Sequence, residues 1–119
     1  MTAELAIATP VLLLVLLTIV QFTLWSHATH VAQTAAAQGL AAARVQSGTA
    51  AAGESQARQT LRQLGDGPLA DVVVDATRST DQATVDVDGV ATSVIPFLRL
   101  AVHAEAAGSV ERFVPDGAR

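Results

Sequence analysis

Glu4-Leu-Ala-Ile-Ala-Thr-Pro10-Val-Leu-Leu-Leu-Val-Leu-Leu-Thr-Ile-Val-Gln21-Phe-Thr-Leu-Trp25 is the stretch that decides the architecture of this 119-residue chain. From Leu5 to Trp25 its 21 residues carry no charge, and about 20 apolar residues suffice to cross a bilayer core about 30 Å thick. Because a backbone in lipid must satisfy its own hydrogen bonds, residues 1–25 are predicted to be a transmembrane helix. A cleavable secretory signal fits less well, since it would have a basic start and a shorter apolar core.

Two residues of this segment are unusual for a membrane helix. Glu4 places a carboxylate at the mouth of the span, where a charge is costly unless it has a partner. It can complement the positive end of the helix dipole, but we favour a contact with a cation of a partner subunit. Pro10 frees one backbone carbonyl and is predicted to kink or loosen the helix.

The helix is predicted to continue beyond the membrane, over Ala3–Gln46 as a whole. Residues 26–47 are rich in alanine and free of proline, and alanine has the highest helix propensity. Small residues recur there at spacings of three and four, a pattern that permits close helix packing. Two interpretations remain open for this stripe, namely packing on the chain's own domain and packing against other copies. The stripe consists of Ala28, Ala32, Ala35, Ala36, Gly39 and Ala43.

Residues 48–119 are predicted to form a small α+β domain. Gly48 ends the long helix, and a second helix follows over Thr49–Leu64, with Gly53 as a weak point and an apolar face of Ala57, Leu61 and Leu64. The apolar period then changes to two, which predicts antiparallel strands with one solvated face. The predicted strands cover 69–77, 83–90 and 98–106, with a possible fourth at 110–114. The long helix and the second helix are expected to cover the apolar face of this sheet.

The composition excludes several kinds of function. The net charge of −4 argues against nucleic acid, and the absence of cysteine excludes disulfides and thiolate metal sites. His27 and His30 are too few ligands for a metal, and Asp86-Val87-Asp88-Gly89 lacks the later glutamate of a calcium loop. Without a phosphate-binding loop or a recognisable catalytic set, we predict neither an enzyme nor a bound cofactor or metal.

The N-terminus carries a resemblance to a known family. Thr2-Ala3-Glu4-Leu5-Ala6, followed by Pro10 and an aliphatic run, resembles the start of TadE-family pilin-like proteins of the tight-adherence (Flp) type IV pilus, in their actinobacterial form. The resemblance implies a minor pilin or pseudopilin that waits in the membrane and then joins or primes the filament by helix packing. It also implies several partners: other pilin subunits, the prepilin peptidase, the inner-membrane platform of the pilus, and the lipid bilayer.

The resemblance also bears on topology and on Glu4. The first cation after the span is Arg44, so charge alone would place the C-terminus inside the cell. The resemblance implies a basic leader, cut off on the cytoplasmic side, and therefore an extracytoplasmic C-terminal domain on a single-pass membrane protein. Glu4 matches the family's glutamate, although it stands one position earlier than in the family pattern. The resemblance implies that this glutamate pairs with the N-terminal amine of a neighbouring subunit. The alternative function is a single-pass envelope binding module without a filament role.

Overall fold

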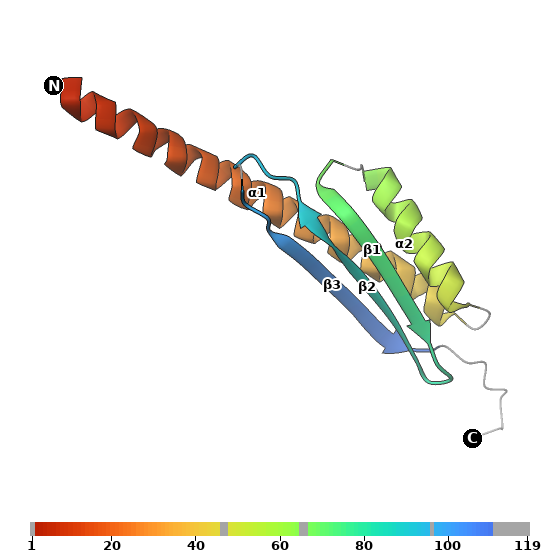
Figure 1. Ribbon diagram of the computed structural model, residues 1–119. Coiled ribbons are helices and arrows are strands. Elements are labelled where there is room, and N and C mark those ends of the chain that lie inside the picture. Colours follow the sequence, from red (N-terminus) through yellow and green to blue (C-terminus); the bar gives the residue numbers. More distant parts are fainter. Residues whose placement is uncertain (1, 46–47, 65–66, 96, 111–119) are drawn as a thin grey trace, which may run out of the picture.

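The computed structural model describes residues 2–45, 48–64, 67–95 and 97–110. Over these residues the chain forms a long helix, a short helix and three strands, which confirms the predicted α+β class. The molecule measures 83 × 24 × 19 Å, because the first helix extends far beyond the domain built on its second half (Figure 1). The elements are α1 (Thr2–Arg44), α2 (Ala50–Leu64), β1 (Leu69–Arg78), β2 (Gln82–Ala91) and β3 (Ala101–Ser109).

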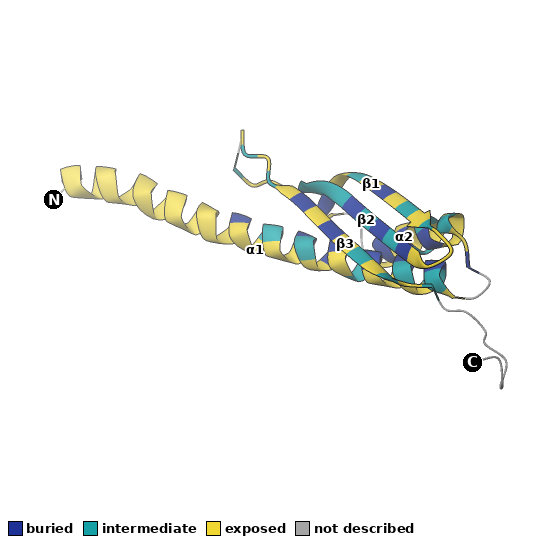
Figure 2. Ribbon diagram, turned by 90° about the horizontal axis from the view of Figure 1, so that it is seen from below, coloured by how far each residue is buried: buried dark blue, intermediate teal, exposed yellow. Residues whose placement is uncertain are grey.

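Helix α1 passes through two environments. Every residue from Thr2 to Val20 is exposed, whereas one face of the helix is buried from Gln21 onward (Figure 2). The helix spans 43 residues, or roughly 65 Å at 1.5 Å per residue. It continues without interruption through Pro10, and the kink predicted there stays a prediction. The end predicted at Gln46 lies outside the described residues, and the observed helix ends at Arg44.

The stripe of small residues is the buried face of α1. All six of its members are buried, and the five alanines are fully inaccessible. They pack against large side chains of the sheet, chiefly Val85, Val87 and Val102, so small residues on the helix let the two layers approach closely. Of the two interpretations left open by the sequence, the structure shows the packing of the stripe on the chain's own domain.

Helix α2 begins after Thr49, whose Oγ1 accepts a hydrogen bond from the amide of Ala52 at 3.0 Å and so caps the helix. It crosses α1 where two glycines meet. A Cβ on Gly39 would lie 2.8 Å from the carbonyl oxygen of Gly53, and a Cβ on Gly53 would lie 2.7 Å from the Cβ of Ala43. Gly53 is therefore a point of close contact between the two helices, and its weakness within α2 stays a prediction.

The apolar face predicted for α2 needs one correction. Ala57 and Leu61 are buried as predicted, but Leu64 is exposed. Leu64 is the last residue of the helix and is 45% exposed, so the domain covers it less than it covers Ala57 and Leu61.

The three strands form an antiparallel sheet in the order β1-β2-β3. The predicted alternation is confirmed, since Val74, Val85, Val87 and Val102 face the helices while the residues between them are at least partly exposed. The pairing of β1 with β2 shifts register between Ala70 and Val73.

The third strand begins later than predicted. It starts at Ala101 and not at residue 98, and it runs on to Ser109. Phe97 has a φ of 74°, which is outside the extended region and prevents strand geometry at this point. Of the possible fourth strand at 110–114, only Val110 is described, and its amide donates a hydrogen bond to the carbonyl of Asp81 at 2.9 Å.

Candidate functional site

The exposed half of α1 is the first candidate site. Its apolar side chains point outward on all sides of the helix, and Ile7 and Leu12 are 70% and 67% exposed. By length and composition α1 can cross a membrane. A continuous apolar surface of this kind requires lipid or other apolar helices around it. This half of the helix is therefore a surface for contacts outside the chain.

Glu4 lies in the first turn of α1, at the far end of this surface. Its side chain is exposed, and it forms no hydrogen bond or ion pair with the residues that the structure describes. The domain first contacts α1 at Gln21, roughly 25 Å away along the helix axis. The structure thus leaves Glu4 available to a partner molecule and brings none of the chain's own cations to it within the described part.

The junction between the exposed half and the domain is built around Gln21, which is only 2% exposed. Its Nε2 donates to the carbonyl of Thr92 at 3.1 Å, and its Oε1 accepts from the amide of Val94 at 2.8 Å. One turn further, Trp25 Nε1 donates to the carbonyl of Ala101 at 3.2 Å. These bonds fasten the segment between β2 and β3 to α1.

Sequence reasoning took Gln21 and Trp25 only as markers of the membrane end and missed these contacts. A signal was present, because an amide side chain inside an apolar helix needs hydrogen-bonding partners. The partners themselves could not be named, since they lie more than 70 residues away in the chain.

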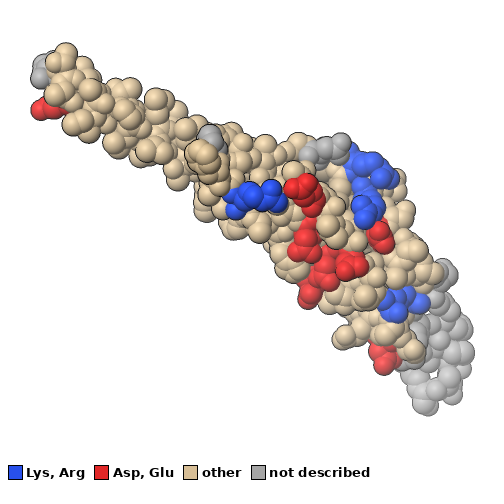
Figure 3. Space-filling model, in the orientation of Figure 1, with Lys and Arg blue, Asp and Glu red and all other residues tan. Residues whose placement is uncertain are grey.

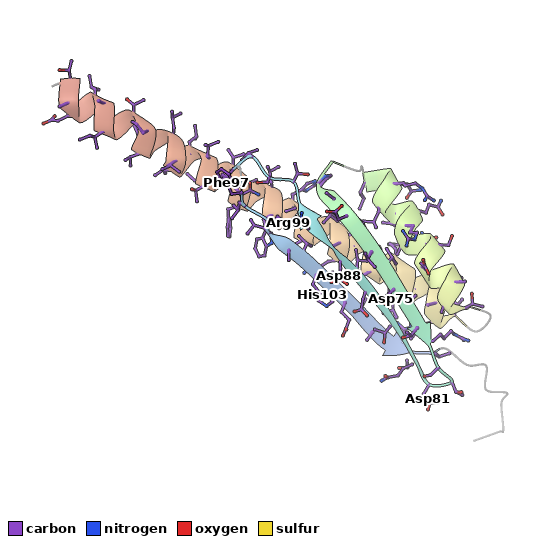
Figure 4. The ribbon with its side chains drawn as sticks, viewed as in Figure 1. Asp75, Asp81, Asp88, Phe97, Arg99 and His103 are labelled. Atoms are coloured by element: carbon purple, nitrogen blue, oxygen red, sulfur yellow. The ribbon has the colours of Figure 1, made fainter. Side chains whose placement is uncertain are left out.

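The outer face of the sheet carries a cluster of acids (Figure 3). Asp86 is paired across the strands with Asp75 on one side and with Glu105 on the other. Like charges directly opposite each other destabilise a sheet. His103 lies opposite Asp88, and its Nδ1 is 2.6 Å from Asp88 Oδ1 (Figure 4). The hydrogen bond to Asp88, together with the negative charges of Asp88, Asp86 and Glu105, raises the pKa of His103 above its usual value.

Three side chains of this cluster have the right atoms for a cation. Ligand atoms of Asp86, His103 and Glu105 lie within 4.8 Å of one another, and Asp86 Oδ1 is buried without a hydrogen-bonding partner among the described residues. Sequence reasoning weighed the run from Asp86 to Gly89 as a calcium loop and did not join His103 and Glu105 to it, because only strand pairing brings these residues together. His103 is already engaged by Asp88, and the prediction that the chain binds no metal stays a prediction.

His27 and His30, the other pair weighed from the sequence, lie on α1 just beyond Trp25. They do not belong to the described group of residues that could hold a metal ion. The structure therefore gives no further support to a site there.

Comparisons with known proteins bear on α1. No curated protein and no solved structure matches the chain. The sequence model of the family described as TadE-like protein matches residues 1–44, which is the whole of α1 with the residue before it. The match covers the exposed apolar half, Glu4 and the buried stripe alike. It agrees with the resemblance drawn from the N-terminal residues: the N-terminal helix of this chain is similar to that of TadE-like proteins.

Proposed function

We propose that this protein is a minor pilin or pseudopilin, a structural subunit of a tight-adherence (Flp) type IV pilus. It waits in the cell membrane, anchored by Leu5–Trp25, with the domain of residues 48–119 outside the cytoplasm. It then joins or primes the filament. One observation carries this proposal. Helix α1, which matches the TadE-like family, has an exposed apolar N-terminal half and a C-terminal half on which the domain packs.

The contact with other subunits is assigned to the exposed half of α1. The stripe from Ala28 to Ala43 is used inside the chain, so it offers no free surface to another copy. Residues Leu5 to Val20 are exposed and apolar almost throughout. Lipid covers them before assembly, and the helices of neighbouring subunits replace the lipid in the filament. Packing of one apolar helix on another keeps these side chains out of water in both states.

Glu4 is the residue proposed to guide this exchange. A carboxylate at the edge of an apolar medium gains most from a cation that forms a charge-assisted hydrogen bond with it. The N-terminal amine of a neighbouring subunit is such a cation, and one bond of this kind would favour one helix register over others. The prepilin peptidase and the inner-membrane platform of the pilus complete the proposed partners.

The experiment that tests the proposal replaces Glu4 by alanine and, separately, by glutamine in the native cell. Both variants are expected to insert into the membrane as the wild type does, because the apolar span is unchanged, and both are expected to abolish pilus assembly. Glu105→Gln is the matched control, since it removes an exposed carboxylate from β3 without touching α1. Normal piliation of the Glu4→Ala strain would refute the role of Glu4.

The alternative, an envelope binding module without a filament role, draws support from the acidic outer face of the sheet, a charged surface suited to a cationic ligand (Figure 3). Deletion of the protein discriminates between the two functions. A pilus subunit is needed for normal piliation, whereas a binding module found only in the membranes of fully piliated cells would leave piliation unchanged.

A further inference from the structure

The segment between β2 and β3, residues 92–95 and 97–100, carries apolar side chains that the domain does not cover. Phe97 is fully exposed, and Val94 is 39% exposed. Ile95 and Leu98 are only partly buried. Phe97 also has a φ of 74°, a conformation that is strained for an aromatic residue and is found mainly where a local function requires it. We call these four residues, Val94, Ile95, Phe97 and Leu98, the apolar loop.

The apolar loop is held at a defined height on α1. The side chain of Gln21 forms hydrogen bonds with the carbonyl of Thr92 and the amide of Val94, at the start of the loop. The amide of Thr92 also donates a hydrogen bond to the carbonyl of Pro68 at 3.1 Å. Of the domain outside α1, this loop reaches furthest toward the N-terminus (Figures 1 and 2). Figure 4 shows Phe97 at the end of the domain that faces the exposed half of α1.

This height coincides with the edge of a bilayer. The distance from Leu5 to Gln21 is roughly 24 Å along the helix at 1.5 Å per residue, whereas the hydrocarbon core is about 30 Å thick. If Leu5 enters the hydrocarbon at one side, the opposite boundary is reached near Trp25, which is beyond the residue that holds the loop. The loop must therefore lie within the boundary layer of the outer leaflet, where aromatic and aliphatic side chains are favourable.

We propose that the apolar loop is a second membrane contact, which inserts Phe97 and its neighbours into the interfacial layer of the bilayer beside α1. This inference rests on the membrane anchoring in the proposed function. We assign lipid as the partner of the apolar loop because the loop lies next to the end of the exposed apolar surface of α1, which lipid covers. Arg99 follows the loop with a side chain that is 72% exposed and forms an ion pair of 3.4 Å with Asp71, so the charged groups of the domain begin directly after the loop. The loop would fix the domain on the membrane before assembly and would have to leave the bilayer when the subunit is extracted.

The chain contains no cysteine, so a single nitroxide label can report depth at a chosen residue. The full chain is reconstituted in phosphatidylcholine–phosphatidylglycerol vesicles with one label at Phe97→Cys, Leu13→Cys or Val73→Cys. Leu13 marks the middle of the span, and Val73 is an exposed residue on β1. The ratio of collisions with oxygen to collisions with a water-soluble nickel complex is then measured by electron paramagnetic resonance.

The expected ratio at residue 97 lies between that at Leu13 and that at Val73, and severalfold above that at Val73. A ratio at residue 97 equal to that at Val73, with Leu13 shielded from nickel, would overturn the proposal while leaving the membrane anchoring intact. A label at Leu13 that is accessible to nickel would overturn the anchoring and this inference together. Spin–spin broadening at residue 97 that grows with the protein-to-lipid ratio, without oxygen access, would show that another copy covers the loop and would also overturn the proposal.

Discussion

Replacement of Gly39 by alanine tests the close crossing of α1 and α2. In an unobstructed helix this change would stabilise by about 0.8–1 kcal/mol, because alanine has the higher helix propensity. Here the new Cβ would lie 2.8 Å from the carbonyl oxygen of Gly53, 3.0 Å from Ala57 Cβ and 3.1 Å from Val85 Cγ1. The backbone oxygen cannot rotate away, so α2 must move, and overpacking of this kind costs about 1–3 kcal/mol. Because the obstructing oxygen belongs to the backbone, we take the upper part of this range, about 2–3 kcal/mol, and after subtracting the gain we expect a net loss of about 1–2 kcal/mol in the free energy of unfolding.

The assay is urea unfolding of the full chain in detergent micelles, followed by the fluorescence of Trp25, the only tryptophan. Trp25 is bonded to the start of β3, so its signal reports separation of the sheet from α1. Gly67→Ala is the matched control, because no atom lies within 4 Å of a Cβ there, and it should stay within about 0.5 kcal/mol of the wild type. A Gly39→Ala variant as stable as the wild type, or more stable, would refute the close crossing.

Three further predictions follow from the core, the junction and the outer face. Val87→Ala should lower the free energy of unfolding by about 2 kcal/mol because this side chain is fully buried, whereas the same change at the exposed Val73 should have little effect in the same urea assay. Gln21→Leu should cost about 1–3 kcal/mol by leaving the Val94 amide and the Thr92 carbonyl without their partner; unchanged hydrogen exchange at the Val94 amide would contradict the junction. Asp88→Asn should lower the pKa of His103 toward its ordinary value, as read from an NMR titration of the imidazole, because Asp88 is the main cause of the raised pKa. Since a raised pKa favours the protonated form in the folded state, this pair stabilises the domain below the ordinary histidine pKa and loses its effect as the pH rises through the raised value. Asp88→Asn should reduce that pH dependence, while Asp86 and Glu105 retain a smaller part of it.

Much of the architecture could be predicted because it depends on patterns within short segments. The apolar run, the alanine-rich continuation and the absence of proline from residue 26 to residue 44 predict one long helix. The alternation around Val74, Val85 and Val102 gave the correct inner face of each strand, even though the start of β3 was misplaced by three residues. Glu4 was identified because it is a charged residue at the start of an apolar run. This signal is also local in the sequence.

The features that were missed depend on partners distant in the sequence. Gly53 looked like a weak point because its contact with Gly39 exists only after two helices cross. Gln21 looked like a boundary residue because Thr92 and Val94 reach it only in the folded domain. The row of Asp75, Asp86 and Glu105 comes from three different strands, and no segment shows it by itself. Periodicity predicts which face of an element is buried, but it does not say what lies against that face.

The central claim is that the exposed half of α1 packs against other pilin subunits when the protein is assembled. A photo-crosslinking amino acid at Leu12, which is 67% exposed in the middle of this half, tests it directly in piliated cells. The account predicts covalent adducts between this chain and another subunit of the same pilus, and none of comparable yield from a crosslinker at Val73 on the domain. Fully piliated cells in which the crosslinker at Leu12 forms no adduct with any pilin subunit would contradict it.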